Sequence, residues 1–304
     1  MSRLFVSGLI NLETTLAVDG FPLVYFPVRY PFFGVQTTVS GVGYNIAKAL
    51  TTLGNRVAFA SLIGRDDNGS LVRRALTRDG IPDDLVLDAI DETAQSVILY
   101  EPGGRRQINT DLKDVQKHPY PLNDQTLAAL QACDLAVICN VNFSRPLLEP
   151  AREMGKRIAT DVHALEDLDD SYNQDYLRMA DILFLSDESL PASPEEVARE
   201  VIARFDTQVV VIGLGAKGAL LALREDGFVG RFEPAQTRPV VNSIGAGDAL
   251  FSAFIDRYLR ADDPLEALQA AMVFASYKIG EKGAASGFLS GEELDAWVEK
   301  TVLE

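Results

Sequence analysis

Short apolar runs alternate with amphipathic segments along almost the whole chain. Each run has the length of a buried strand, and the segment after it repeats apolar residues every three or four positions, as a helix does. This order is typical of a mostly parallel sheet covered by helices, so the sequence predicts an α/β fold. The predicted strands are Leu4 to Ser7, Val57 to Ile63, Leu135 to Cys139, Arg157 to Thr160, Ile182 to Leu185 and Val209 to Ile212. The predicted helices are Gly43 to Leu53, Gly69 to Arg78, Asp124 to Gln131, Arg145 to Met154, Pro194 to Phe205, Gly247 to Leu259 and Pro264 to Lys282.

Two regions depart from this alternation. Residues 12 to 39 and residues 95 to 110 alternate apolar and polar positions as strands do, and the second region contains a Pro102-Gly103-Gly104 turn. We predict that they form a small separate β-sheet that closes over a site as a lid. No segment repeats and no low-complexity linker marks a boundary, so residues 1 to 304 are predicted to be one domain that carries this lid.

Composition narrows the class of protein. Hydrophobic residues make up 47% and charged residues 24% of the 304-residue chain, which is ordinary for a soluble globular protein. The net charge of −16 repels nucleic acid and anionic lipid, so neither is an expected partner. No apolar run approaches the roughly 20 residues of a membrane span, and Arg3 leads straight into a strand, so we expect no membrane span or signal peptide. Cys133 and Cys139 flank an apolar run and fit packing residues in a reducing compartment, which favours the cytoplasm.

The segment Asn242 to Leu250 carries the clearest candidate chemistry. Apolar residues recur at helical spacing after it, so Gly245, Ala246 and Gly247 are predicted to open a helix. Unpaired N–H groups and the helix dipole favour an anion there, and glycine lets the anion approach. Asp248 lies in the first turn, where it can take a proton from a group that attacks the anion. Phosphoryl transfer requires both parts, although the same residues also fit an ordinary capped helix start.

A second glycine motif invites a different interpretation. Gly213-Leu214-Gly215-Ala216-Lys217-Gly218 follows a predicted strand and matches the G-x-G-x-x-G fingerprint of dinucleotide sites. That fingerprint requires a following helix, whereas Ala219 to Leu223 and Phe228-Val229 flank a turn and are typical of a β-hairpin. The sequence therefore argues against a dehydrogenase and favours a glycine-rich turn that lines the phosphates of a nucleotide.

Polar residues near the N-terminus are candidates for ligand contacts. Asn11 and Glu13 follow the first predicted strand, at the end where open α/β sheets bind ligands. The segment Ser40 to Asn45 opens a helix, and its glycines permit close approach of a polar ligand while Asn45 offers an amide to hydroxyl groups. The plainer interpretation of this segment is a glycine turn before an amphipathic helix.

Other polar residues are weaker candidates. The segment Gly64 to Gly69 reads as a loop and helix cap, and Arg105-Arg106 reads as solvated unless it meets phosphate. His118 and His163 are isolated from any third ligand at a metal spacing, so both are interpreted as surface or packing residues.

Taken in order, these motifs resemble the ribokinase-like carbohydrate kinase family, also called the PfkB family. The resemblance extends from about Leu4 to Trp297. It rests on Gly-Leu-Ile-Asn after the first strand, Ser-Gly-x-Gly-x-Asn before a helix, the segment Gly64 to Gly69, the Gly213 to Gly218 turn, and Gly-Ala-Gly-Asp at 245 to 248.

The resemblance implies an ATP-dependent kinase with a β-sheet lid that often serves as a homodimer contact. Asp248 would be the base that activates the acceptor hydroxyl, and Gly245, Ala246 and Gly247 would hold the transferring phosphoryl group. The residues implied in acceptor binding are Asn11, Glu13, Gly41 and Asn45. The residues implied at the ATP phosphates are Gly213, Gly215 and Gly218, with Ser276 and Gly283 nearer the nucleotide end.

Several positions depart from the family pattern. Asn242-Ser243 replaces the usual Asp-Thr, whose Asp is associated with a monovalent cation site, so the resemblance does not carry potassium activation over. The magnesium motif Asn-x-x-Glu aligns with Ser186 to Ser189, where Asp187 or Glu188 would have to act through water in a shifted register. Glu13 replaces an Asp near the acceptor, and Val42 replaces the lysine of ribokinase proper.

The leading hypothesis is therefore a magnesium- and ATP-dependent kinase that phosphorylates a primary hydroxyl of a sugar or sugar derivative. A nucleoside kinase of the same fold is the nearest alternative, with lid aromatics as a shelf for the base; these are Phe21, Tyr25, Phe26, Tyr30, Phe32 and Phe33. A non-catalytic sugar- or nucleotide-binding regulator is the alternative from a different class, because the magnesium and cation positions are substituted.

Overall fold

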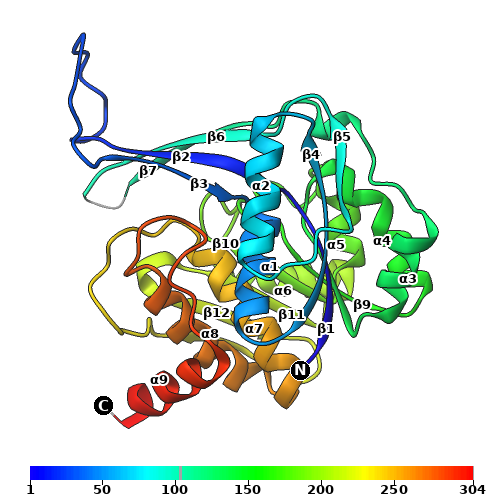
Figure 1. Cartoon of the computed structure of the whole chain (residues 1–304). Helices are drawn as coiled ribbons and strands as arrows, with labels where there is room; N and C mark the ends of the chain where they lie inside the picture. The colour runs from blue at the N-terminus through cyan, green and yellow to red at the C-terminus, as the bar shows by residue number, and fades with distance from the viewer. Residues whose placement is uncertain (103–104, 304) are drawn as a thin grey trace.

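The computed structural model describes residues 1–102 and 105–303 (Figure 1). The larger of the two sheets in these residues has nine strands. Its strand order is β13-β12-β11-β10-β9-β8-β1-β4-β5. The parallel strands are β1 (Arg3–Ser7), β4 (Arg56–Gly64), β5 (Val86–Ile90), β8 (Leu135–Ile138), β9 (Arg157–Asp161), β10 (Ile182–Ser186) and β11 (Val209–Gly213). The antiparallel strands at one edge are β12 (Ala219–Leu223) and β13 (Val229–Phe232). The predicted mostly parallel sheet is confirmed.

Helices cover both faces of this sheet, because alternate residues of each buried strand face opposite sides. In β1, Leu4 and Val6 pack on one face and Phe5 packs on the other. The helices of the first face are α1 (Val42–Thr52), α2 (Asp67–Arg78), α7 (Ala246–Ala261) and α8 (Pro264–Lys278), with α9 (Gly291–Leu303) against α8. The helices of the second face are α3 (Asp124–Ala132), α4 (Leu148–Glu153), α5 (Gln174–Met179) and α6 (Pro194–Phe205).

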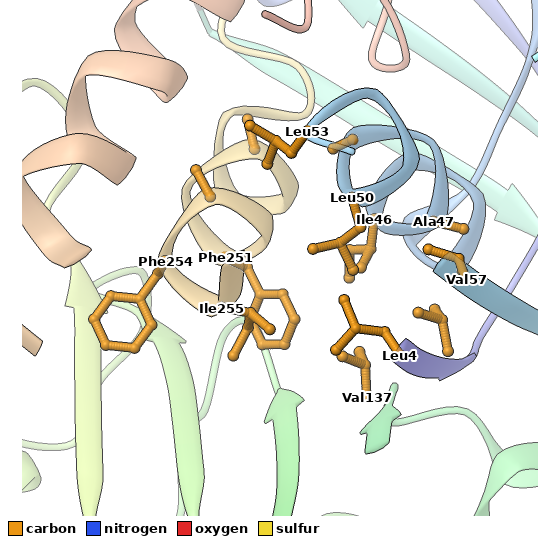
Figure 2. Packing of buried hydrophobic residues seen from close by; sticks show 14 of the residues in the cluster. Leu4, Ile46, Ala47, Leu50, Leu53, Val57, Val137, Phe251, Phe254 and Ile255 are labelled. Atoms are coloured by element: carbon orange, nitrogen blue, oxygen red, sulfur yellow. The ribbon is translucent and has the colours of Figure 1, made fainter. Parts of the chain in front are cut away.

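α7 packs beside α1 on the same face of the sheet (Figure 2). Figure 2 shows side chains of both helices, including Phe251 of α7 and Leu50 of α1, pointing down toward Leu4 of β1. Phe184 of β10 meets the Phe251 ring edge-on, with ring centroids 4.9 Å apart. Burial of each such side chain contributes about 1.5–3 kcal/mol, so the start of α7 is held firmly at the carboxyl end of the sheet.

The small sheet contains four strands in the order β3-β2-β6-β7 (Figure 1). These strands are β2 (Asn11–Ala17), β3 (Val35–Ser40), β6 (Gln95–Tyr100) and β7 (Arg106–Asp111). The separate small sheet predicted from residues 12 to 39 and 95 to 110 is confirmed. Residues 18–34 at its tip are an irregular loop rather than strand, because Pro22, Pro27 and Pro31 have no N–H for a ladder. The predicted turn at Gly103-Gly104 lies outside the described residues.

Some predicted boundaries were wrong for local reasons. The helix expected at Arg145 to Met154 begins as the 3-10 helix η2 (Asn142–Leu147), which contains Pro146, and becomes α4 only at Leu148. The helix expected to reach Lys282 ends at Lys278, and residues 237–241 form an irregular segment. The cap predicted at Gly64 to Gly69 is confirmed, since Asp66 Oδ1 accepts from Gly69 N at 2.8 Å. Within the described residues, no helix combines the length and apolar character needed to cross a membrane.

Candidate active site

Two glycines at the start of α7 have different surroundings: there is open space beside Gly247, whereas Gly245 packs against the backbone of Ala284. Gly245 has a φ of 75°, and a Cβ there would lie 2.6 Å from the carbonyl oxygen of Ala284, so only glycine fits without a shift. Gly247 is exposed, and a Cβ there would meet nothing within 4 Å. The first N–H groups of a helix have no partner within it, so the amides of Gly245 and Gly247 are candidates for an anion, whereas Ala246 N already donates to the carbonyl oxygen of Ser243 at 3.2 Å.

Asp248 lies in this first turn and is held by a side chain from the opposite helix. Asn45 Nδ2, near the start of α1, donates to Asp248 Oδ2 at 2.7 Å across 203 positions of sequence. Burial raises the pKa of the Asp248 carboxyl above its ordinary value, and the Asn45 bond partly offsets that rise. A carboxylate with a raised pKa and a fixed orientation is suited to accept a proton at near-neutral pH.

The predicted acceptor residues gather beside Asp248. Glu13 and Asn11 belong to β2, and Ser40 Oγ lies 3.1 Å from Glu13 Oε2 and 3.3 Å from Asn45 Oδ1. Asn11 Nδ2 donates to Ser96 Oγ at 3.1 Å. Asn11 Oδ1 and Glu13 Oε1 are buried without a hydrogen-bond partner among the described residues. Two unsatisfied acceptors next to the base are an arrangement that hydroxyl donors of a ligand would complete.

Gly41 has a structural reason to be glycine. Its φ is 106°, and a Cβ there would lie 2.6 Å from the carbonyl oxygen of Leu9. It precedes α1 as its N-cap residue. Gly41 therefore sets the path of the chain from β3, which pairs with the strand of Glu13, into α1, which carries Asn45. This path brings the side chains of Glu13 and Asn45 close together.

Burial also raises the pKa of the Glu13 carboxyl. The nearby Asp248 carboxylate adds to this rise, whereas the bond from Ser40 lowers the pKa. The acceptor site thus holds two carboxyl groups that each disfavour the charge of the other. A ligand that donates hydrogen bonds to Glu13 would relieve that cost.

The Gly213 to Gly218 motif forms the turn of a β-hairpin, so the argument against a dinucleotide helix is confirmed. After β11, the 3-10 helix η3 (Gly215–Lys217) leads directly into β12, and Leu214 N donates to Gly218 O at 2.9 Å. A Cβ on Gly218 would lie 1.9 Å from the carbonyl oxygen of Phe232, whereas one on Gly215 would meet nothing within 4 Å. Gly218 is thus required by the hairpin, while Gly213 and Gly215 leave room for a ligand.

Ser276 and Gly283 lie at and after the end of α8, near residues 242–247, which we call the anion loop. Ser276, in the last turn of α8, pairs with Thr237 through hydroxyl oxygens 3.0 Å apart. Gly283 has a φ of 84° in the segment between α8 and α9, which also carries Ala284. Since Ala284 O approaches Gly245, this segment borders the same helix start.

Asp187 and Glu188 follow β10 at the carboxyl edge of the large sheet. Asp187 N donates to Gly213 O at 2.9 Å, and Glu188 N donates to Ser186 Oγ at 3.2 Å. Within the described part of the chain, no group of three His, Cys, Asp or Glu residues could hold a metal. These residues fit a magnesium ion carried by nucleotide phosphates and held through water, rather than a cage made by the protein.

His163, interpreted from the sequence as a surface or packing residue, has a half-exposed side chain and lies near Asp248. His163 Nδ1 lies 3.4 Å from Asp161 Oδ2 at the end of β9. The Asp161 carboxylate raises the pKa of Asp248, and a positive charge on His163 lowers it. Their position at the carboxyl end of a predicted strand was a usable signal, which the isolation of His163 in the sequence concealed.

The small sheet contacts the anion loop directly. Arg106 Nη1 of β7 donates to Ser243 Oγ at 2.9 Å. Ile98 of β6 packs with Ile244 and Ala284 in a separate apolar cluster. The sheet that carries Glu13 is therefore in contact with the loop before α7 and with the segment between α8 and α9.

An oriented carboxylate beside an open helix start, at the carboxyl edge of a mostly parallel sheet, is an arrangement that suits phosphoryl transfer. The chain belongs to the pfkB family of carbohydrate kinases, whose profile matches residues 1–290. The predicted resemblance and the predicted fold are thus confirmed, and the protein is a carbohydrate kinase by family.

Three similar proteins illustrate this membership. Acarbose 7(IV)-phosphotransferase of an Actinoplanes species is 31% identical over 268 residues, with 86% of each chain covered. ATP-dependent ribose-1-phosphate kinase of Halopiger xanaduensis is 26% identical over 290 residues, which cover 94% of this chain and 95% of the relative. The solved structure of the microbiome-derived acarbose kinase Mak1 has a TM-score of 0.88 and 27% identity, over 98% of this chain and 99% of that chain.

Proposed function

We propose that this carbohydrate kinase transfers the γ-phosphoryl group of ATP to a hydroxymethyl group of a sugar or sugar derivative, with Asp248 as the base. The observation that carries the proposal is the hydrogen bond from Asn45 to Asp248 Oδ2, at the opening of a helix that begins with Gly245, Ala246 and Gly247. It combines acceptor recognition, base orientation and anion binding within one site.

The chemistry follows from this arrangement. The acceptor hydroxyl loses its proton to Asp248 as its oxygen bonds to the γ-phosphorus, and the bond to the bridging oxygen of ADP breaks. The amides of Gly245, Ala246 and Gly247 stabilise the negative charge on the transferring group. Asp187 and Glu188 would hold water around a magnesium ion, which supplies neutralisation of the β- and γ-phosphate charge. Gly213, Gly215 and Gly218, with Ser276 and Gly283 beyond them, would border the nucleotide.

The acceptor is a polyhydroxyl compound in this proposal. Asn11 Oδ1 and Glu13 Oε1 are buried acceptors that need donors, and sugar hydroxyls are donors. The names of two relatives point the same way, since one phosphorylates acarbose and the other ribose 1-phosphate.

The small sheet acts as a lid in this mechanism. The lid comprises residues 12–39 and 95–110 of a single domain, 1–304. Support comes from Arg106 and Ile98, which reach the anion loop from β7 and β6. Closure would exclude water from the phosphoryl group while the acceptor is held against Asp248.

The tip of the lid is proposed to form a homodimer contact. Large apolar side chains in residues 18–34 are exposed, including Tyr25 (87% exposed) and Phe33 (98% exposed). This loop lies at the far end of the small sheet from the helices (Figure 1), which favours a subunit contact over a nucleobase shelf. Light scattering during size exclusion should report a dimer, and Tyr25→Ser with Phe33→Ser should give a monomer. A monomeric native chain would contradict the contact.

The cytoplasm is the proposed location. ATP is available there, and Cys133 and Cys139 are free, buried thiols that suit a reducing compartment.

An ADP-release assay tests the function. The acceptor panel should include hexoses, pentoses, ribose 1-phosphate, acarbose and nucleosides, each with and without magnesium. We expect magnesium-dependent ADP release with at least one carbohydrate. Release with nucleosides alone would indicate the nucleoside kinase, and tight sugar binding without ADP release would indicate the non-catalytic regulator.

A further inference from the structure

Lys278, the last residue of α8, is a lysine with no exposed surface. Its Nζ donates a hydrogen bond to the backbone carbonyl oxygen of Ile244, a neutral group rather than a carboxylate. Lysine is rarely buried to this extent, because removing an ammonium group from water is costly unless the group is compensated. A buried ammonium therefore requires an explanation in terms of the charges around it.

Charges from several elements face this ammonium. The carboxylates of Asp248 on α7 and Glu13 on β2 favour its charged form, and the guanidinium groups of Arg106 on β7 and Arg238 before the anion loop oppose it. Burial is the largest influence and lowers the pKa of Lys278 to about 8. Lys278 is therefore the buried positive charge shared by the base and the acceptor site.

The bonded carbonyl belongs to the peptide that begins the anion hole. Ile244 C=O and Gly245 N–H are the two ends of one peptide unit, so a positive charge on the oxygen polarises the N–H toward a stronger donor. The same turn is fixed at its other end by Asn242 Oδ1, which accepts from Ile244 N at 3.1 Å. Lys278 thus acts on the phosphate site through the backbone, without reaching the phosphate itself.

In the family, an Asp-Thr sequence at this turn is associated with a monovalent cation. Residues 242–245 of this chain do not fit such an ion. Asn242 supplies no negative charge, and its Oδ1 is already bonded within the turn. The carbonyl oxygen of Ile244, which a cation would need as a ligand in this turn, already accepts from an ammonium group. A second cation placed beside Lys278 would be repelled by it.

We propose that Lys278 is a positioning residue that serves as a built-in cation under the anion hole, so that phosphoryl transfer proceeds without potassium. This inference rests on the kinase function proposed above and deepens it. The amide Gly245 N–H is polarised and the 242–245 turn is held by a covalently attached ammonium, in place of an ion taken from solution.

The first test is the ion dependence of the purified kinase. Initial rates should be measured with KCl, NH₄Cl or tetramethylammonium chloride at constant ionic strength. We expect the native chain to give the same rate in all three salts. Activation by potassium of several-fold over tetramethylammonium would overturn the proposal.

The second test removes the ammonium. Lys278→Met keeps the length of the side chain, and we expect kcat to fall by about 10- to 100-fold, the range typical when a residue that orients a directly acting group is lost. Lys282→Met, four residues further on and exposed, is the matched control and should keep native kcat. Unchanged kcat in Lys278→Met would overturn the proposal.

A third variant restores a cation site. Asn242→Asp combined with Lys278→Met supplies a carboxylate and frees the Ile244 carbonyl, so potassium should raise its kcat above that of Lys278→Met alone. Potassium should also raise the melting temperature of this double variant but not of the native chain, since an ion bound only to the folded state stabilises it. If neither quantity responds to potassium, the role as a built-in cation is contradicted.

Two readouts separate this role from a purely structural one. The native profile of kcat/KM should decline on the alkaline side near the pKa of about 8 of Lys278, and this decline should be absent in Lys278→Met. Because the folded state lowers this pKa, it penalises the ammonium below pH about 8. Lys278→Met should therefore melt no lower than the native chain at neutral pH. Loss of activity together with lower stability and an unchanged alkaline limb would indicate a structural role only.

Failure of the inference is distinguishable from failure of the proposed function. Should the native chain release no ADP with any acceptor, the kinase proposal fails. If the native chain is active while Lys278→Met is equally active in tetramethylammonium, the kinase stands and the built-in cation does not.

Discussion

Two glycine-rich turns of this protein each contain one glycine that the fold requires and one with open space around it, but different elements follow them. At Gly247 a side chain would meet nothing, so the absence of one keeps space for a ligand. At Gly218 a Cβ would collide with a carbonyl oxygen of β13, so glycine is required by the fold itself. The element that follows the turn decides what its amides can do. The turn at 245–247 opens a long helix, whose first N–H groups have no partner within the helix, whereas the turn at 213–218 opens a hairpin, in which Leu214 N donates to Gly218 O. Similar glycine spacing in a sequence therefore carries no function until the next element is known.

The largest expected effect distinguishes the two turns by their chemistry, since only the first has a base. Asp248→Asn should lower kcat by roughly 10²- to 10⁴-fold, as the loss of a general base does, and leave the binding of ATP and acceptor nearly unchanged. Asp262→Asn is a matched control, because Asp262 caps the other end of α7 and is exposed. Steady-state kinetics and calorimetric binding check both variants. Near-native turnover in Asp248→Asn would remove this residue from the role.

The two ends of the anion loop should separate activity from stability. Gly247→Ala should fold with a native melting temperature and lose roughly 10-fold or more in kcat, because its methyl group occupies the approach to the amides. Gly245→Ala should be destabilised by about 1–3 kcal/mol or more, since its φ is positive and its Cβ would press on Ala284 O. Thermal unfolding with kinetics on each folded variant makes the measurement. A stable, inactive Gly245→Ala would contradict this division.

The two glycines of the hairpin turn should differ in how much stability they lose. Gly218→Ala should lower stability by several kcal/mol or prevent folding, because β12 and β13 must part to admit the methyl group. Gly215→Ala, with open space around it, should cost only about 1–2 kcal/mol for its left-handed backbone. Denaturant unfolding measures both. Equal losses at the two positions would show that backbone conformation, rather than the contact with Phe232, governs this turn.

The smallest effect concerns a residue that trades stability for function. The folded state raises the pKa of Glu13, so it favours the protonated carboxyl and loses stability as pH rises through and above the ordinary range of a glutamate. Glu13→Gln should therefore raise the melting temperature by about 1–3 °C at pH 8, an effect on the order of 1 kcal/mol in a chain of this size. The gain should shrink at acid pH, where both states of the native chain are protonated. A gain that is independent of pH would have another cause.

Much of the architecture could be predicted because it depends on local pattern. The parallel strands and their covering helices repeat apolar residues at periods that sequence displays directly, and the Ser193 and Glu196 capping box marks the start of α6. Elements with weaker patterns were missed: three of the five residues of the edge strand β5 are not buried, and α5 is only 6 residues long. The 13-residue α9 was also missed, although Leu294, Trp297 and Val298 recur in it at helical spacing.

The site was predictable in part for a different reason. Asp248 and the glycines were found because they are consecutive in sequence and resemble a known motif. The Asn45 to Asp248 bond, the Arg106 to Ser243 bond and the buried Lys278 join positions more than 30 apart, and no periodic pattern connects them. These contacts arise from how α1, α7, α8 and the small sheet pack, so only the structure could place them.

The cluster of Ile98, Ile244 and Ala284 joins the small sheet to the loop before α7, and its small size has a consequence for how that sheet would move. Parting it exposes only three apolar side chains, at a cost of a few kcal/mol on the scale of about 25 cal/mol per Å². In the lid proposed above, opening would therefore require the loss of only this small contact and of the Arg106 to Ser243 hydrogen bond.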